Sequence, residues 1–248
     1  MQVFSKFKSV HDLEYVTKSY LYLNENEEDI KSIDDINLLL KKKNKNVAGT
    51  IFLYNPTTIP LGFKSSEKLS NQDFIFDDNF WESSVEEGVR IFGKVLRKKF
   101  PGQLVEIKYL FSYIKENIQP TSVLEVFELD LEKLNTNQLT VFAKNDNYHD
   151  FKNISYNGRF IFFAWGHKFD KHHTNISTYA SNIAHWASKT DKEISFMYDG
   201  VQNLNDSFEY TRFINPVAFG KLKLIIPEAL KIIFSKEIIE PLCIKNMV

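Results

Sequence analysis

Three short polar motifs follow apolar stretches of this chain, and their side chains are the ones best suited to chemistry. The first follows "GTIFLY", the second lies within "FAWGHK", and the third lies within "INPVAFGK". Amides and hydroxyls can hold a water or the polar edge of a ligand, a lysine can offset phosphate charge, and a glycine lets backbone approach a ligand closely. The candidate residues are Asn55, Pro56, Thr57 and Thr58 in the first motif, Gly166, His167 and Lys168 in the second, and Asn215, Phe219 and Lys221 in the third.

Each motif also has a purely structural interpretation, which stays open at this point. Asn55-Pro56 can simply end a strand and cap the following turn, because proline cannot donate to a ladder and asparagine favours turns. Trp165-Gly166 can be a core aromatic residue followed by a tight turn. Only the recurrence of three such motifs favours a site over three ordinary strand exits.

Other reactive groups give weaker signals. His167, His172 and His173 lie close together with Asp170 between them, but their spacing matches no metal pattern, so we expect no metal and a hydrated loop instead. Asp77 and Asp78 could be a base or a cation ligand, or a solvated pair near a helix start. The chain has no glycine-rich phosphate loop and no Gly-x-Ser-x-Gly elbow, and its one cysteine excludes an internal disulfide. We therefore expect no bound cofactor.

The elements that would position the three motifs alternate between strand and helix. Short apolar runs predict strands, and a helical repeat with polar residues on one side predicts helices. Two capping boxes, Ser83-x-x-Glu86 and Ser84-x-x-Glu87, favour a helix start at that point. The predicted strands cover 47–55, 103–114, 158–166 and 193–198, and the predicted helices cover 80–100, 174–190 and a last helix with Pro227 in its first turn.

This order predicts an α/β fold: a three-layer αβα arrangement with a central, mainly parallel four-stranded sheet. Residues 1–46 have a different texture, with an acidic block, a leucine cluster and a basic run, and we expect an N-terminal helical extension packed on the core. Residues 47–248 form a single α/β domain in this interpretation. Ligands of such sheets bind beyond the carboxyl ends of the strands, where the motifs fall.

Composition narrows the classes of function only slightly. With 31 basic and 32 acidic residues the formal net charge is −1, so no overall basic excess suggests tight duplex binding. Hydrophobic residues make up 43% of the chain, which is typical of a globular protein. No stretch approaches the roughly 20 apolar residues of a membrane helix. We expect no membrane contact and a cytoplasmic location.

The order of the motifs resembles a small bacterial family of uncharacterised domains that carry N-P-S-T, N-L-F, A-W-G and H-P-L-Y. That family is similar to the uracil-DNA glycosylase superfamily, in which N-P-G or D-P-Y ends the first strand, W-G ends the third and H-P-S-P follows the fourth. The resemblance covers about Val47 to Lys221 and implies a uracil-DNA-glycosylase-like fold.

The resemblance also implies roles for individual residues. Asn55 would position a water, Asn215 would stand where the superfamily has a histidine that donates to the leaving base, and Phe219 would take the place of the residue that wedges into the base stack. Asparagine at 215 can donate a hydrogen bond but cannot carry a proton to the base. Val217 replaces a phosphate-binding serine, and Tyr109 stands where the family has an asparagine.

Two functions therefore remain open. The first is a glycosylase-like site that binds a nucleobase, nucleotide or nucleic acid, with hydrolysis of an N-glycosidic bond as its reaction; Phe63 or Tyr109 would stack on the ring and Lys168 or Lys221 would offset phosphate. The second is a catalytically inactive factor on the same scaffold that binds a ligand or a protein partner. The first requires Asn55, Trp165 and Asn215 to converge on one pocket.

Overall fold

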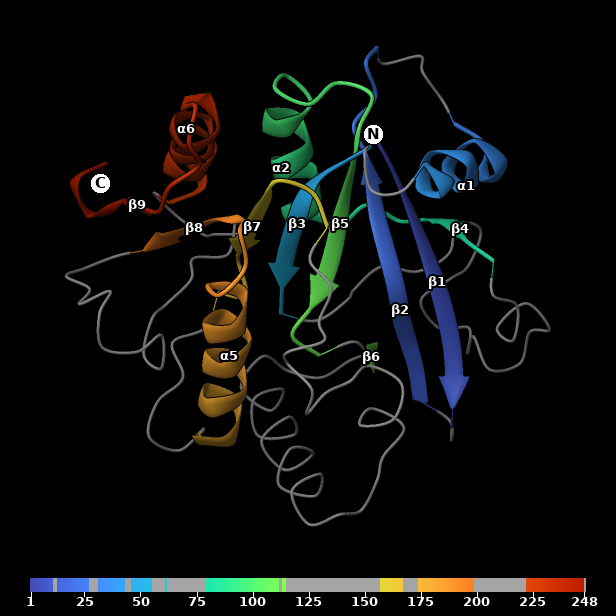
Figure 1. The fold of residues 1–248 in the computed structure, drawn as a ribbon, viewed down its shortest axis with the longest axis horizontal. Coiled ribbons are helices and arrows are strands. Elements are labelled where there is room, and N and C mark those ends of the chain that lie inside the picture. Colours follow the sequence, from blue (N-terminus) through green and yellow to red (C-terminus); the bar gives the residue numbers. More distant parts are fainter. Residues whose placement is uncertain are drawn as a thin grey trace.

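The computed structural model describes residues 1–10, 13–26, 31–42, 46–54, 61, 79–111, 113–114, 157–166, 174–198 and 222–247. Within them the chain is an α/β protein whose helices pack on one sheet (Figure 1). The helices are α1 (Ile33–Lys41), α2 (Glu87–Leu96), α5 (Thr174–Ala187) and α6 (Leu222–Ser235), with a 3-10 turn, η5 (Lys245–Met247), near the end. The strands are β1 (Gln2–Val10), β2 (Leu13–Tyr22), β3 (Val47–Leu53), β4 (Trp81–Ser83), β5 (Leu104–Tyr109), β6 (Tyr113–Ile114), β7 (Phe160–Phe163), β8 (Glu193–Tyr198) and β9 (Leu242–Cys243).

The sheet is mixed and wider than the sequence predicts. Its strand order is β4-β1-β2-β5-β3-β7-β8-β9, with β6 paired to β2. The segment from β5 to β9 is parallel, and it contains the four strands expected from the apolar runs. Antiparallel pairing begins between β5 and β2 and continues through β1 to β4. Figure 1 shows the long β1–β2 pair at one side of the sheet and β9 at the other.

The N-terminal region corrects the expectation of a helical extension. Its first two elements, β1 and β2, are strands that join the same sheet as the rest of the chain, and only α1 is helical. In "QVFSKF" the side chains alternate between two buried surfaces: Val3 packs in the cluster that also holds α2, whereas Phe4 packs in the cluster that holds α1. This two-residue period is typical of a strand that is covered on both faces. The acidic and basic runs within residues 1–46 suggested a helical extension instead, so the strand pattern was not recognised from the sequence.

Helices cover both faces of the sheet. On one face Phe162 of β7 packs edge-on against Phe92 of α2 and lies beside Phe234 of α6, with ring centroids 4.9 and 5.8 Å away. On the other face Ile36 of α1 is fully buried in a cluster with Phe4 of β1. Helices on each side explain why β7, with the sequence FIFF, is apolar along its whole length.

The expected capping boxes at the start of α2 are absent. Ser83 is the last residue of β4 and is buried, and its hydroxyl lies 3.0 Å from the hydroxyl of Ser5. The helix begins after Glu86, whose side chain makes no capping hydrogen bond. Pairing of β4 with β1 places Ser83 in the sheet, opposite Val3, and the local sequence motif gives no sign of this pairing.

Helix α6 begins earlier than expected, so Pro227 lies inside it rather than in its first turn. A proline there removes one intrahelical hydrogen bond, at a cost of about 3 kcal/mol. Burial of Ile226, Leu230 and Ile233 offsets this, because each is fully buried and contributes about 1.5–3 kcal/mol. The predicted helix over 174–190 is confirmed as α5, and its residues Ile176, Ala180, Ile183 and Ala187 are all buried.

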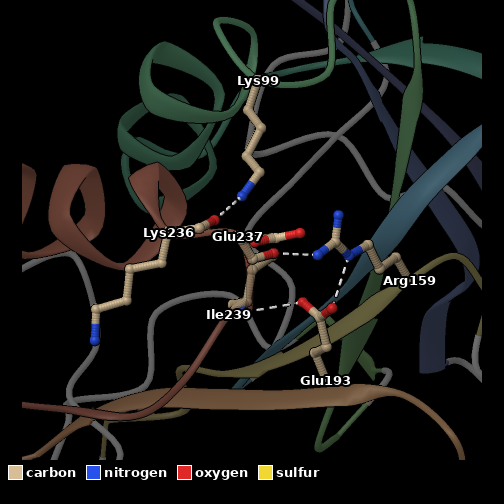
Figure 2. A network of polar contacts seen from close by, with 6 residues as sticks. All are labelled: Lys99, Arg159, Glu193, Lys236, Glu237 and Ile239. Atoms are coloured by element: carbon tan, nitrogen blue, oxygen red, sulfur yellow. Dashed lines mark hydrogen bonds and ion pairs between the residues drawn. The ribbon is translucent and has the colours of Figure 1, made fainter.

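A polar network ties the amino ends of β7 and β8 to the segment after α6 (Figure 2). The Arg159 guanidinium donates from Nε to Glu193 Oε1 at 2.7 Å and also donates to the Glu237 carbonyl. The other carboxylate oxygen of Glu193 accepts from the Ile239 backbone N–H at 3.0 Å. Lys99 donates to the Lys236 carbonyl beside it. These contacts hold the C-terminal segment in place so that β9 can pair with β8.

Candidate functional site

The order of the parallel strands points to one end of β3 and β7. The chain runs from β3 to β5 on one side and then crosses to β7 on the other side, so its direction across the sheet reverses at β3. In open α/β sheets, ligands bind beyond the carboxyl ends of the strands at such a reversal. The carboxyl ends here are Tyr54, which follows β3, and Gly166, which follows β7. We call the region beyond them the strand-end site.

The register brings these two ends close together. Phe52 and Phe163 are direct partners in the parallel pair, and the Ala164 N–H donates to the Phe52 carbonyl at 2.8 Å. On the other side of β3, the Phe111 N–H donates to the Tyr54 carbonyl at 2.9 Å. Three strands therefore end side by side. In the chain, Asn55 follows Tyr54 directly and His167 follows Gly166 directly.

Packed aromatic side chains lie at the carboxyl ends of β3 and β7, next to the strand-end site. Trp165 is fully buried, and its ring centroid lies 4.9 Å from that of Phe163 and 6.1 Å from that of Phe52. Phe111 connects the end of β3 to α5, since its ring centroid is 5.6 Å from Tyr54 and 6.0 Å from Tyr179. Trp165 thus has a packing role in the core.

Gly166 has a backbone conformation that favours glycine. Its φ is +85°, in the left-handed region where a side chain is strained. The backbone therefore leaves the extended conformation at Gly166, three residues after the end of β7. Both the turn interpretation and the close approach of a ligand require glycine at this position, so the geometry is compatible with each.

Tyr109 is not available for stacking at the strand ends. Its side chain is buried, with 8% exposure, and its hydroxyl donates to Glu86 Oε1 at 2.8 Å, just before α2. The ring therefore packs in the layer between the sheet and α2. Burial raises the pKa of Tyr109 well above its ordinary value; the charge and hydrogen bond of Glu86 raise it further, and a hydrogen bond with Ser19 lowers it slightly.

Alkaline destabilisation should report on Tyr109. Because its pKa is higher in the folded state, its contribution to stability is complete below the unfolded pKa near 10 and is lost as the pH rises above it. Each group with a raised pKa makes the free energy of unfolding fall more steeply with pH, by up to about 1.4 kcal/mol per pH unit. We expect Tyr109→Phe to flatten the fall in the free energy of unfolding, measured with urea between pH 9 and 11.

A matched control is Leu224→Ala on the exposed side of α6, which removes no ionisable group and should leave the slope unchanged. An unchanged slope in Tyr109→Phe would show that this phenol is ionised as readily in the folded as in the unfolded chain. Tyr20 and Tyr54 also have raised pKa values, both through burial first, so part of the slope should remain in either variant.

Most of the residues expected at the site lie outside the described residues. Their convergence, including that of Asn55 with Asn215, therefore stays a prediction. The same holds for the histidine cluster and for Asp77 and Asp78. The site residues concerned are Asn55, Pro56, Thr57, Thr58, Phe63, His167, Lys168, Asn215, Phe219 and Lys221.

A buried polar cluster surrounds Glu106 in the middle of β5 and was not predicted from the sequence. Glu106 is the one charged residue among the buried residues of the described chain, at 6% exposure. Its Oε2 accepts from Asn157 Nδ2 at 2.9 Å and from the Thr50 hydroxyl at 3.3 Å, and its Oε1 lies 3.2 Å from Lys108 Nζ. The signal was a carboxylate between valine and isoleucine in "LVEIKY". Asn157 precedes β7, so this cluster lies away from the strand-end site.

The described ranges hold no group of three or more histidine, cysteine, aspartate or glutamate residues placed to bind a metal. No helix in them is both long and apolar enough to cross a membrane. Comparison of the chain with known protein families, with curated proteins and with solved structures finds no match in any of the three.

Proposed function

We propose that the protein binds a nucleobase or nucleotide at the strand-end site. One observation carries this proposal: β3 and β7 are parallel neighbours at the point where the strand order reverses, and the polar motifs begin two and three residues beyond their last residues, Leu53 and Phe163. The two motifs are more than a hundred residues apart in the chain, but the strands that precede them are hydrogen-bonded neighbours, with Phe52 opposite Phe163. The glycosylase-like order of motifs supports a base-like ligand in this place.

Each motif supplies a different kind of contact in this proposal. Asn55 offers an amide to a water or to the polar edge of the base. His167 and Lys168 follow Gly166 in the chain, and in this proposal the lysine offsets the charge of a phosphate. Phe63 supplies a face on which a ring can stack, a contact worth about 1–3 kcal/mol per base. Asn215, Phe219 and Lys221 complete the site from the third motif.

Hydrolysis of an N-glycosidic bond is the reaction that this arrangement would catalyse. Asn55 would position the attacking water, and the Asn215 amide would donate to the base as it takes up negative charge. Asn215 cannot transfer a proton to the departing base. That substitution, together with valine at 217, favours a second candidate, a binding factor that uses the same site without chemistry.

Binding is tested by titrating the full chain at low salt with dUMP, a single-stranded oligonucleotide and a duplex. We expect saturable binding of dUMP that weakens about tenfold in Asn55→Ala, because one hydrogen bond to a ligand is worth about 1–1.5 kcal/mol. Asn37→Ala is the matched control, since Asn37 lies on α1, before the amino end of β3. No binding of any of the three ligands, or equal weakening in both variants, would contradict the proposal.

Catalysis is tested separately with duplexes that contain uracil or 5-hydroxymethyl pyrimidines. Loss of a base leaves a site that alkali cleaves, which a gel detects directly. Cleavage that requires Asn55 and Asn215 would identify the glycosylase function. Nucleotide binding without cleavage would identify the inactive binding factor.

A further inference from the structure

A groove between α2 and α6 combines an apolar floor with a basic rim. Its volume is about 740 Å³. Ile91, Val95 and Phe234 form its buried or half-buried floor, and exposed lysines line it from α2 (Lys94), from the turn after α2 (Lys98) and from α6 (Lys231). Helices α2 and α6 are separated by more than a hundred residues in the chain, so this combination exists only in the folded protein.

The groove is distinct from the strand-end site. It lies along the carboxyl-terminal halves of both helices, and Lys99 at its edge donates to the Lys236 carbonyl. In Figure 2 this contact lies beside Arg159 and Glu193, which mark the amino ends of β7 and β8. The strand-end site lies at the opposite ends of these strands. The groove therefore needs its own explanation.

The rim carries an excess of positive charge. Among the described residues, Lys231 is paired with Glu228 at 2.5 Å, whereas Lys94 and Lys98 have no acidic partner. Counting Lys99, four lysines and one glutamate leave a net charge of +3 (4 − 1). The two helix carboxyl ends offset about one unit of this, at roughly half a charge each, so about two positive charges remain. Capping of the helix dipoles alone does not account for so many lysines.

We propose that this groove binds a free single-chain amphiphilic anion of the fatty-acid class. The aliphatic chain would lie on Ile91, Val95 and Phe234, and the carboxylate would sit between Lys94 and Lys98. The groove's volume lies within the range of about 300–1,000 Å³ found for small-molecule sites. A stable protein partner would instead cover about 800 Å² on each side, far more than one groove between two helices. A nucleic-acid backbone would leave the apolar floor unused.

The first test is calorimetric titration of the full chain with dodecanoate below its critical micelle concentration. We expect one saturable site, weaker binding of uncharged dodecanol and no binding of the dodecyltrimethylammonium cation. Lack of saturable dodecanoate binding would overturn the proposal. So would equal binding of the cation, since the lysines would then play no part.

Two variants locate the site, and a third serves as their control. The double variant K94Q/K98Q should bind dodecanoate at least tenfold more weakly, whereas K18Q/K189Q removes the same charge elsewhere on the surface and should bind normally. Ser235→Trp places an indole in the groove from an exposed position and should abolish binding. Unchanged thermal midpoints would show that all three variants are folded.

Several outcomes would overturn the assignment. These are unaltered binding by K94Q/K98Q, equal weakening in K18Q/K189Q, or full affinity in Ser235→Trp. Binding of an acidic amphipathic peptide or of phosphatidylglycerol vesicles, without binding of dodecanoate, would replace this ligand by a protein partner or a membrane surface. The proposal is independent of the strand-end site, so K94Q/K98Q should bind dUMP as the unaltered chain does.

Discussion

Gly158→Ala is expected to destabilise the protein by about 3 kcal/mol or more, the sum of backbone strain and overpacking. The φ of Gly158 is +80°, which already strains any other residue. A Cβ atom there would lie 2.4 Å from the backbone nitrogen of Gly49 and 2.5 Å from the carbonyl carbon of Ala48. These atoms belong to β3 in the centre of the sheet, so they cannot move aside without breaking its pairing. Urea unfolding monitored by circular dichroism measures the loss.

Gly102→Ala is the matched control for this prediction. Gly102 also has a positive φ, +71°, but an added Cβ would meet no atom within 4 Å. Only the strain of the backbone applies, at about 1 kcal/mol. If both variants lost the same free energy of unfolding, the close contact between the turn before β7 and the backbone of β3 would be wrong.

This contact also bears on the strand-end site. A Cβ at Gly49 would lie 2.4 Å from the ring of Phe160, its partner residue in β7. Gly49 and Gly158 thus allow the amino end of β7 to lie against β3, and the register continues from there to Phe163. Any Gly158→Ala protein that remains folded should bind dUMP more weakly, because the ends of β3 and β7 would no longer align.

Phe162→Ala is expected to cost about 3–5 kcal/mol, the range for removing a buried aromatic ring from a core. Phe162 is fully buried in β7 and contacts Phe92 of α2 and Phe234 of α6, so one ring joins three elements. Its removal leaves a cavity between the sheet and the two helices. A lower urea midpoint with an unchanged m-value would show that stability alone has changed.

Leu224→Ala tests whether burial is the cause. Leu224 lies on α6 with 80% exposure, and a leucine-to-alanine change at such a surface position should alter stability by less than about 0.5 kcal/mol. A small effect of Phe162→Ala, comparable to that of Leu224→Ala, would contradict the packing of α2 and α6 on this face of the sheet.

The sequence predicted those elements whose signal is local. The helix α5 followed from its local repeat, and the short apolar runs located β3, β7 and β8. Local signals failed for the start of α2 and for the N-terminal strands. Ser83 fits a capping motif, but it pairs with β1 some eighty residues earlier, a contact that no window around it contains.

The candidate site divides in the same way. Strand ends rich in polar residues were visible in the sequence, and the geometry of parallel sheets predicted that they share one edge. Which ends are adjacent was decided by the strand order. Tyr109 shows the limit: the resemblance suggested a stacking contact there, but its side chain is buried and its hydroxyl donates to Glu86, just before α2.

The sequence by itself determined the central buried strands, the helix α5 and the residues that follow the strands. It could do so because the period of apolar residues along a helix or strand fixes which side chains share its buried face. Only the tertiary structure decided that β1 and β2 extend the sheet and that Glu106 is buried. It also decided that Lys94 and Lys98 line the same apolar groove as Lys231 of α6. These features join segments far apart in the chain. Their formation depends on the free energy of packing the whole molecule, which no single stretch of residues specifies.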